Sequence, residues 1–232
     1  MDGLILVDKP LGWTSFDVVN KLRRLAAEEL DKRPKQVKVG HTGTLDPLAT
    51  GLLVVLLGGY CKRAQEFSKL DKTYAVTMRL GQNSDTGDEE GQKTVVSDWQ
   101  PTYAELEAAL QQFTGEIMQT PPAYSAIKVN GQRAYDLARA GRPVVLEPRP
   151  VQVYSIQLGS YVYPDVHFTA EVSSGTYIRS LVADVGQALG IGAYMAGLQR
   201  TSVGQFSLSD AHSMDTLASS HKHSLTQFIK VV

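Results

Sequence analysis

A glycine-rich stretch holds the residues of this chain that are best suited to chemistry. It runs from residue 39 to 53, reads VGHTGTLDPLATGLL, and contains three glycines, one histidine and a single carboxylate, Asp46. Glycine permits close backbone approaches that a Cβ forbids, and loops specified so narrowly tend to present a functional group. An isolated carboxylate can act as a nucleophile. The alternative is structural, because Gly, Asp and Pro are also ordinary turn residues and Asp46 could cap a tight turn.

Composition narrows the class of protein. The chain has 232 residues, of which 43% are hydrophobic and 20% charged, which is typical of one large globular domain or two close-packed lobes. Its one cysteine, Cys61, excludes an internal disulfide and fits a reducing cytosol. We expect no signal peptide and no membrane span, since the longest apolar run is residues 52–57. The five histidines and the cysteine show no metal-ligand spacing.

Charge is unevenly distributed along the chain. The net charge is −1, which argues against binding nucleic acid by bulk charge. Residues 21–72 nevertheless hold eleven Lys and Arg against six acidic residues, whereas residues 85–107 hold seven acidic residues against one lysine. A charge run is often only a solvated face, but this basic excess flanks Asp46. The distribution therefore favours a phosphate-contacting surface beside the glycine-rich loop.

The elements that must position this loop are predicted from periodicity, caps and turns. Strands are expected at residues 4–7, 52–57, 73–80, 124–129, 151–163 and 166–172. Helices are expected from Thr14 or Ser15 to Glu29, then at residues 62–70, 106–113, 134–140 and 178–189. The first helix is expected to bury Phe16, Val19, Leu22 and Leu25. Asn130-Gly131 predicts a tight turn. Strands and helices mix without regular alternation, which predicts an α+β fold.

Five motifs resemble those of the TruB family of tRNA pseudouridine(55) synthases. They are KPLGWTS at residues 9–15, GHTGTLDPLATG at 40–51, KTY at 72–74, SGTYIR at 174–179 and LQRT at 198–201. They stand in the family's order and span most of the chain. The resemblance implies a pseudouridine synthase fold, with a mixed, largely antiparallel sheet flanked by helices and a catalytic cleft. It places the catalytic domain at residues 1–210 and leaves 211–232 as a short tail, including His221-Lys222-His223.

The resemblance also assigns an activity and its catalytic residues. The reaction would convert uridine 55 in the tRNA T loop to pseudouridine, which breaks the C1′–N1 bond and forms C1′–C5. Asp46 would be the catalytic carboxylate, and Arg179 its ion-pair partner, whose permanent charge keeps the carboxylate ionised. Tyr74 would pack on the base and take part in moving the C5 proton. Taken alone, Tyr74 would read as a core residue and Arg179 as a surface residue.

Further residues are assigned to the substrate. His41 would fill the space left by the flipped uridine, since extrusion costs roughly a few kcal/mol. Tyr177 and Leu198 would be pocket walls, and Lys62, Arg63 and Arg200 would contact the RNA backbone. Gln199 stands beside Arg200 where a basic residue is expected.

The resemblance implies partners and one departure. We expect tRNA, through its T-arm, as the partner, and a cytoplasmic monomer that needs no cofactor, metal or guide RNA. Longer family members end in a PUA domain, and the roughly 30 residues after Thr201 are too few for one.

Two other functions stay open. One is a non-catalytic RNA-binding or tRNA-folding protein. The other is a hydrolase in which His41 serves Asp46 as a general base, although no serine or cysteine nucleophile motif accompanies it.

Overall fold

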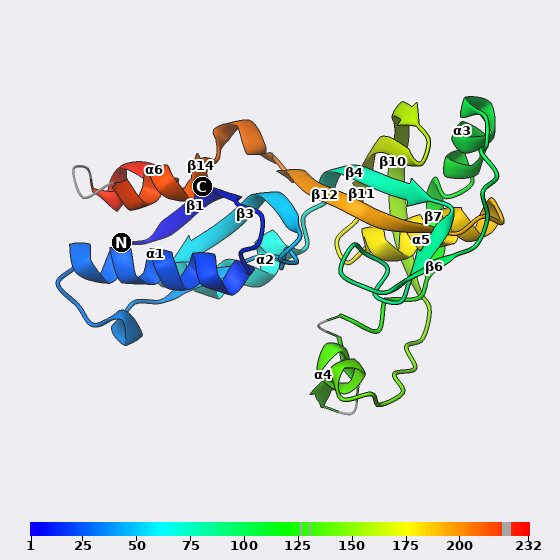
Figure 1. Cartoon of the computed structure of the whole chain (residues 1–232). Helices are drawn as coiled ribbons and strands as arrows, with labels where there is room; N and C mark the ends of the chain where they lie inside the picture. The colour runs from blue at the N-terminus through cyan, green and yellow to red at the C-terminus, as the bar shows by residue number, and fades with distance from the viewer. Residues whose placement is uncertain (126, 130, 220–223) are drawn as a thin grey trace. The chain divides into compact units, whose positions relative to one another are not determined.

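The fold is that of a computed structural model, which describes residues 1–125, 127–129, 131–219 and 224–232. The chain forms two compact units (Figure 1). Unit 1 consists of Met1–Tyr74 and Leu198–Val232, and unit 2 consists of Ala75–Gly197. Unit 2 is thus inserted into the sequence of unit 1. The chain leaves unit 1 along β4 (Lys72–Leu80) and returns along β12 (Ala193–Val203).

Unit 1 contains a small mixed sheet in the order β14-β1-β3-β12. Strand β3 pairs antiparallel with β1 and parallel with β12, and it also pairs antiparallel with β2. The described strands are β1 (Gly3–Lys9), β2 (Val39–His41), β3 (Ala49–Leu57), β13 (Phe206–Ser207) and β14 (His212–Ser213). The helices are α1 (Ser15–Glu29), α2 (Ala64–Ser68) and α6 (Met214–Ala218), with short 3₁₀ turns η1 (Pro34–Gln36), η2 (Gly58–Arg63), η3 (Leu208–Asp210) and η5 (Leu225–Phe228).

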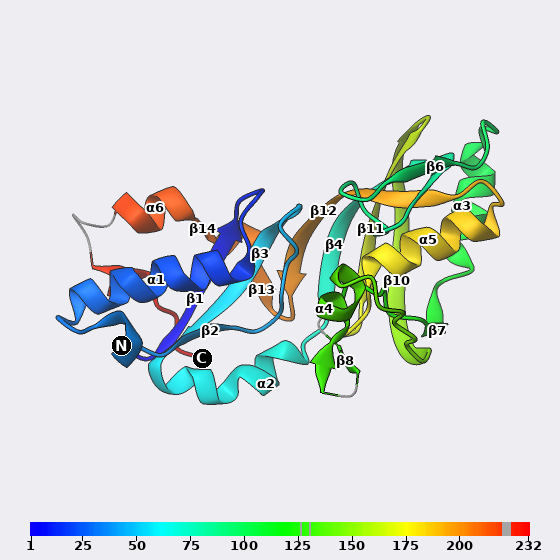
Figure 2. The same cartoon turned by 60° about the horizontal axis from the view of Figure 1, so that its bottom comes forward.

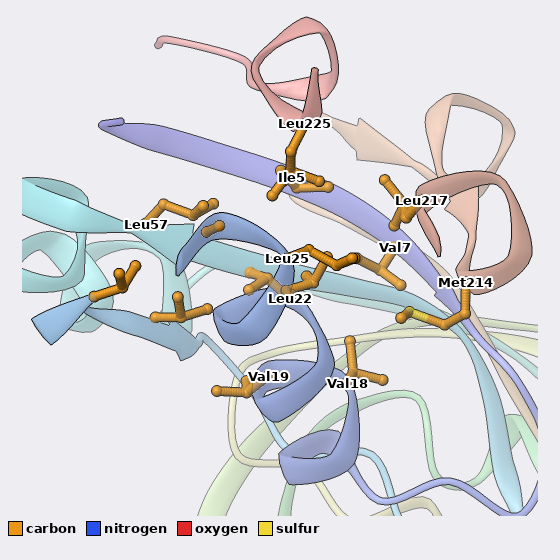
Figure 3. Packing of buried hydrophobic residues seen from close by; sticks show 14 of the residues in the cluster. Ile5, Val7, Val18, Val19, Leu22, Leu25, Leu57, Met214, Leu217 and Leu225 are labelled. Atoms are coloured by element: carbon orange, nitrogen blue, oxygen red, sulfur yellow. The ribbon is translucent and has the colours of Figure 1, made fainter. Parts of the chain in front are cut away.

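Strand β3 is covered on both faces, which explains its uninterrupted apolar sequence. On one face, Leu53, Val55 and Leu57 pack in a cluster with α1 and α6 (Figures 2 and 3). On the other face, Leu52, Val54 and Leu56 join a cluster that includes Phe67 and Phe206. The predicted strand 52–57 is confirmed and begins three residues earlier.

Helix α1 begins where the sequence predicted. Thr14 accepts a hydrogen bond from Asp17 N (3.0 Å), and the Asp17 carboxylate accepts one from Thr14 N (2.9 Å). This reciprocal capping satisfies donors that the first turn leaves unpaired. The prediction that Phe16 is a core residue was wrong, because its side chain is 61% exposed. The buried stripe starts at Val18 and continues through Val19, since Phe16 lies on the first turn and points off that stripe.

The described residues of 211–232, expected to be a short C-terminal tail, pack against the rest of unit 1. Strand β14 pairs with β1, and Lys230 exchanges backbone hydrogen bonds with Leu4 (2.8 and 2.9 Å). Leu217 and Leu225 lie in the same cluster as α1 (Figure 3). This segment therefore completes the core of unit 1. The predicted solvated run His221-Lys222-His223 lies outside the described residues.

Unit 2 is built on a sheet in the order β12-β4-β11-β10-β7. Its strands are β5 (Gln82–Ser84), β6 (Lys93–Val95), β7 (Gly115–Gln119), β8 (Lys128–Val129), β9 (Gln132–Arg133), β10 (Arg149–Val162) and β11 (Asp165–Val172), with β5-β6 and β8-β9 forming small hairpins. Its helices are α3 (Tyr103–Gln111), α4 (Ala134–Arg139) and α5 (Ile178–Ala188).

The fold class is the predicted one, a mixed and mostly antiparallel sheet with helices. The capping box at Thr102 and the strand pair β10-β11 are also confirmed. Of the predicted strand 124–129, only Lys128–Val129 are strand among the described residues, and Asn130 of the predicted turn lies outside them. Strands β7 and β12 had no counterpart in the prediction.

Glu29, at the end of α1, holds the C-terminal segment in place. Its carboxylate accepts hydrogen bonds from Leu225 N (2.6 Å), from the Thr226 hydroxyl (2.7 Å) and from the Ser224 hydroxyl. It thereby binds the start of η5, whose N-cap residue is Ser224, from a helix that is distant in the sequence. Burial alone would raise the pKa of Glu29, but these hydrogen bonds outweigh burial and lower it.

Glu29→Gln should lower the free energy of unfolding by about 1 kcal/mol at pH 7, the usual scale for losing a cap. Because the folded pKa lies below the ordinary 4.5, this contribution is present above about pH 4.5 and is lost as the pH falls through the folded pKa. Urea unfolding across pH 3 to 7 measures it, with Glu28→Gln as the matched control. A difference between wild type and Glu29→Gln that persists undiminished at pH 3 would contradict this role.

Candidate active site

The loop that carries Asp46 leaves the sheet at a defined point on β3. Strand β1 pairs with β3 along Gly51–Leu57, so β2 and β12 must share the opposite edge. There β12 pairs with Ala49–Gly51 and β2 with Val55–Leu57. The loop, residues 42–48, connects β2 to β3 across this junction. Thr42 N donates to Val54 O (3.1 Å), and Ala49 N donates to Asp46 O (3.0 Å), which closes the loop at both ends.

The two residues that flank Asp46 are both held by the segment at residues 9–15. Ser15 Oγ accepts a hydrogen bond from Leu45 N (2.8 Å) and donates to Leu45 O (3.1 Å). On the other side, Pro47 O accepts from Gly12 N (2.8 Å) and from Lys9 Nζ (3.4 Å). Pro47 also restricts Asp46 to extended backbone conformations. The position of the Asp46 backbone is therefore fixed from both sides.

Lys9 is the buried cation in this arrangement. Its side chain is 0% exposed, and Nζ also donates to Pro10 O (2.9 Å) and Trp13 O (2.6 Å). Burial lowers the pKa of Lys9 to about 8, and among the neighbouring charges Asp46 opposes that shift most strongly. Lys9 thus donates a hydrogen bond to the loop at Pro47 O, and its charge is close enough to interact with the Asp46 carboxylate.

His41 lies at the end of β2, immediately before the loop. Its side chain is partly buried, and Nδ1 has no hydrogen-bond partner among the described residues. Burial lowers the pKa of His41, and the nearby Arg200 charge lowers it further. The imidazole is therefore neutral at neutral pH. A neutral, flat ring suits insertion between bases better than it suits an ion pair with a carboxylate.

Tyr74 and Leu198 belong to the same unit as Asp46. Tyr74 is 8% exposed on the buried face of β4, which it shares with Val76 and Met78 as predicted. Leu198 pairs with Ala49, three residues after Asp46, so the sheet register brings it beside the end of the loop. Unit 1 therefore contains four of the predicted catalytic and uridine-binding residues, namely His41, Asp46, Tyr74 and Leu198.

Tyr177 and Arg179 belong to unit 2. Gln119 holds the backbone of Tyr177 through two hydrogen bonds (2.8 and 3.0 Å), and Arg149 lies 5.3 Å from the centre of its ring. Arg179 is 7% exposed. It donates to Thr86 O (3.2 Å) and Tyr124 O (2.7 Å) and lies 3.5 Å from the Asp88 carboxylate. The ion pair between Arg179 and Asp46 stays a prediction.

The three residues predicted to contact the RNA backbone differ in exposure. Lys62 is exposed. Arg63 makes a two-pronged ion pair with Glu66 (2.7 and 2.9 Å), so its charge is already matched. Arg200 is 2% exposed, and its guanidinium donates to Leu52 O (2.7 Å) and Gly43 O (3.0 Å). A phosphate contact needs an accessible side chain, so the role predicted for Arg200 does not fit the structure.

Sequence reasoning assigned no catalytic or binding role to three buried residues close to the loop, Lys9, Ser15 and Lys72. Lys9 and Ser15 lie inside the KPLGWTS motif, and Lys72 opens the KTY motif, so the motifs themselves were the available signal. Lys72 is buried and donates to Ser68 O (2.8 Å) and Leu70 O. In the described part of the chain, no group of three His, Cys, Asp or Glu side chains could hold a metal ion. Within the same residues, no helix is both long and apolar enough to cross a membrane.

Comparison with known proteins decides the family. Residues 31–178 match the model of the TruB family pseudouridylate synthase N-terminal domain. This chain belongs to the TruB family. Residues 179–230 of this TruB chain match the tRNA pseudouridylate synthase B C-terminal domain. That match includes the segment expected to be a tail and agrees with its packing in unit 1.

Named relatives of this TruB chain agree with the assignment. It is 44% identical to tRNA pseudouridine synthase B of Burkholderia lata, over 94% of this chain and 65% of the relative. It is 43% identical to the protein of the same name from Aquifex aeolicus, over 95% of this chain and 75% of the relative. The chain therefore spans about two thirds to three quarters of these relatives. In a crystal structure of a Cbf5-Nop10-Gar1 complex, one chain is similar to this one with a TM-score of 0.74 and 29% identity, over 98% of this chain and 59% of that one.

Lys9→Met should lower the free energy of unfolding by about 2 to 4 kcal/mol at pH 7, because buried carbonyls of Pro10, Trp13 and Pro47 lose their donor. The folded pKa of Lys9 is about 8 against an ordinary 10.5, so the unfolded chain binds more protons between these values. Wild-type stability should therefore rise with pH across this window.

Lys72 has the same folded pKa of about 8, so Lys9→Met should remove about half of that rise. Urea unfolding between pH 7 and 10.5 measures both effects, and exposed Lys32→Met is the control. An equal pH slope in wild type and Lys9→Met would rule out a depressed pKa at Lys9.

Proposed function

We propose that this chain converts uridine 55 in the T loop of tRNA to pseudouridine. The reaction detaches the base at C1′–N1, rotates it and reattaches it through C5. It needs a carboxylate at a fixed place beside C1′, walls that retain the free base, and a group that handles the C5 proton. The observation that carries the proposal is the double support of Asp46, whose neighbours Leu45 and Pro47 are each hydrogen-bonded by the segment at residues 9–15.

In this proposal, Asp46 acts on the ribose, either by attack on C1′ or by assisting elimination to a glycal. Tyr74 packs on the base and takes part in moving the C5 proton, while Leu198 and Tyr177 wall the pocket. Arg179 pairs with Asp46 and keeps it ionised. The neutral imidazole of His41 occupies the space that the flipped uridine leaves. None of these steps requires a cofactor.

The identities of the relatives support tRNA as the substrate and action without a guide RNA. The proteins named tRNA pseudouridine synthase B are 43–44% identical to this chain. The similar chain in a structure of an H/ACA RNP bound to a substrate RNA is 27% identical, with a TM-score of 0.69. We therefore propose that a monomer of this chain acts in the cytoplasm on the tRNA T-arm.

The two alternatives predict different behaviour. A non-catalytic RNA-binding or tRNA-folding protein would bind the T-arm without isomerising it. A hydrolase would need His41 as the general base for Asp46, yet Nδ1 of His41 has no partner among the described residues. The contacts at Leu45 and Pro47 favour the isomerase, because a protein that only binds RNA has no need of a carboxylate held so firmly.

Asp46→Asn should abolish turnover because the amide is no nucleophile, while leaving RNA binding intact. The assay follows tritium release from a T-arm stem-loop labelled at uridine C5. Asp98→Asn, the same change at an exposed carboxylate, should release tritium at the wild-type rate. Tight binding without release by the wild type, on the stem-loop and on full-length tRNA, would leave an RNA-binding protein.

Lys62→Gln should weaken stem-loop binding and reduce the slope of log K against log salt by about 0.9, the amount for one lost phosphate contact. Arg63→Gln should change the slope less, since Glu66 already balances its charge. Fluorescence titrations at 50 to 300 mM salt compare the two. Equal slopes for wild type and Lys62→Gln would remove Lys62 from the RNA surface.

A further inference from the structure

The junction on β3 leaves a gap in backbone pairing, and one side chain fills it. On the edge that β2 and β12 share, β12 pairing stops at Gly51 and β2 contacts resume at Val54. Between them, Leu52 O accepts a hydrogen bond from Arg200 Nε (2.7 Å). An unpaired buried carbonyl would cost about 1 to 3 kcal/mol, so this contact replaces a missing strand bond.

The same guanidinium reaches the loop. Its NH2 group donates to Gly43 O (3.0 Å), three residues before Asp46. One buried, planar group therefore joins the backbone of β12, β3 and the loop. Arginine is suited to this task because its donors are fixed in a fork, whereas a lysine ammonium is a single point on a flexible stem.

Two glycines of the sequence motif lie against Arg200, Gly51 against its backbone and Gly43 against its side chain. A Cβ on Gly51, where φ is +95°, would lie 2.4 Å from Arg200 O, so β3 and β12 can pair here only if residue 51 is glycine. A Cβ on Gly43 would lie 3.4 Å from the Arg200 NH1 atom, at the close end of ordinary van der Waals contact. The two glycines thus leave room for the backbone and the guanidinium of Arg200.

We propose that Arg200 is a positioning residue: it fixes the Gly43 end of the catalytic loop against β3, places Asp46 for reaction, and does not contact RNA. This inference rests on the proposed function. Arg200 acts through the loop, and its hydrogen bonds to Leu52 O and Gly43 O reach none of the predicted substrate-binding residues, so its loss should affect the rate of the bound complex more than the affinity.

Single-turnover tritium release at saturating stem-loop, together with the stem-loop Kd, tests the proposal. Arg200→Gln should slow release by about 100-fold, the usual scale for displacing a reacting group by about 1 Å, with Kd changed less than about twofold. The release rate of Arg200→Lys should lie between those of wild type and Arg200→Gln, because lysine keeps the charge but cannot bind both carbonyls. Arg23→Gln, which removes an arginine contact to Val39 O (3.1 Å) away from the loop, should keep the wild-type rate.

Gly43→Val keeps the proposal testable if Arg200→Gln folds poorly. Its branched side chain extends from a Cβ that would already lie 3.4 Å from Arg200 NH1, so it should slow release by itself but add little in the Arg200→Lys background, where that atom is gone. If the two substitutions slow release in the double variant by the full product of their separate factors, the proposal is wrong. It is also wrong if the Kd of Arg200→Gln rises while its saturated rate stays normal, which is the behaviour of a phosphate contact.

Amide hydrogen exchange separates this inference from the proposed function, because it needs no turnover. Arg200→Gln should speed exchange at Thr42 N and Ala49 N, the two bonds that close the loop, and should leave β1 protected. If the two amides exchange faster in Arg200→Gln while the wild type releases no tritium, the positioning role is supported and the isomerase is rejected. Unchanged exchange at both amides would overturn the positioning role.

Discussion

The shared edge of β3 is the constraint on which unit 1 depends. Strand β3 pairs with β1 along Gly51–Leu57 on one side and with two different strands, β2 and β12, on the other. A loop that begins and ends at such a junction has its ends fixed by sheet hydrogen bonds. Its middle is then the only part that needs further support, and the segment at residues 9–15 provides it at Leu45 and Pro47.

Buried cations, rather than buried ion pairs, provide much of this support. The hydrogen bonds of the Lys9, Lys72 and Arg200 side chains end on backbone carbonyl oxygens, and those of Lys9 and Arg200 reach the loop at Pro47 and Gly43. Burial lowers the pKa values of Lys9 and Lys72 to about 8, and the charge of Arg200 adds to both shifts. Positive charges that are bound to neutral acceptors leave a positive potential around the loop.

Helix caps and buried strands could be predicted from the sequence, because they depend on residues that are close together in the chain. Thr14 and Thr102 were recognisable as caps because their partners, Asp17 and Glu105, stand three residues on. The run at 52–57 was recognisable as a buried strand. The role of Arg200 was not predictable, because it depends on which strands meet at β3. The same holds for Leu217 and Leu225, whose place in the core depends on the pairing of β14 with β1. Motif resemblance supplied Asp46 and its predicted partners, which periodicity alone could not.

The order of assembly follows from the way unit 2 interrupts unit 1. Unit 2 is continuous in sequence, whereas Glu29 meets Ser224 and Leu4 meets Lys230 only when nearly the whole chain has been made. Synthesis proceeds at about 5–20 residues per second, so residues 75–197 can fold while β1, α1 and β3 still lack part of their core. Contacts of such high sequence separation slow folding. The Asp46 loop is anchored to β12, a late strand, and is therefore among the last parts of the chain to take its final form.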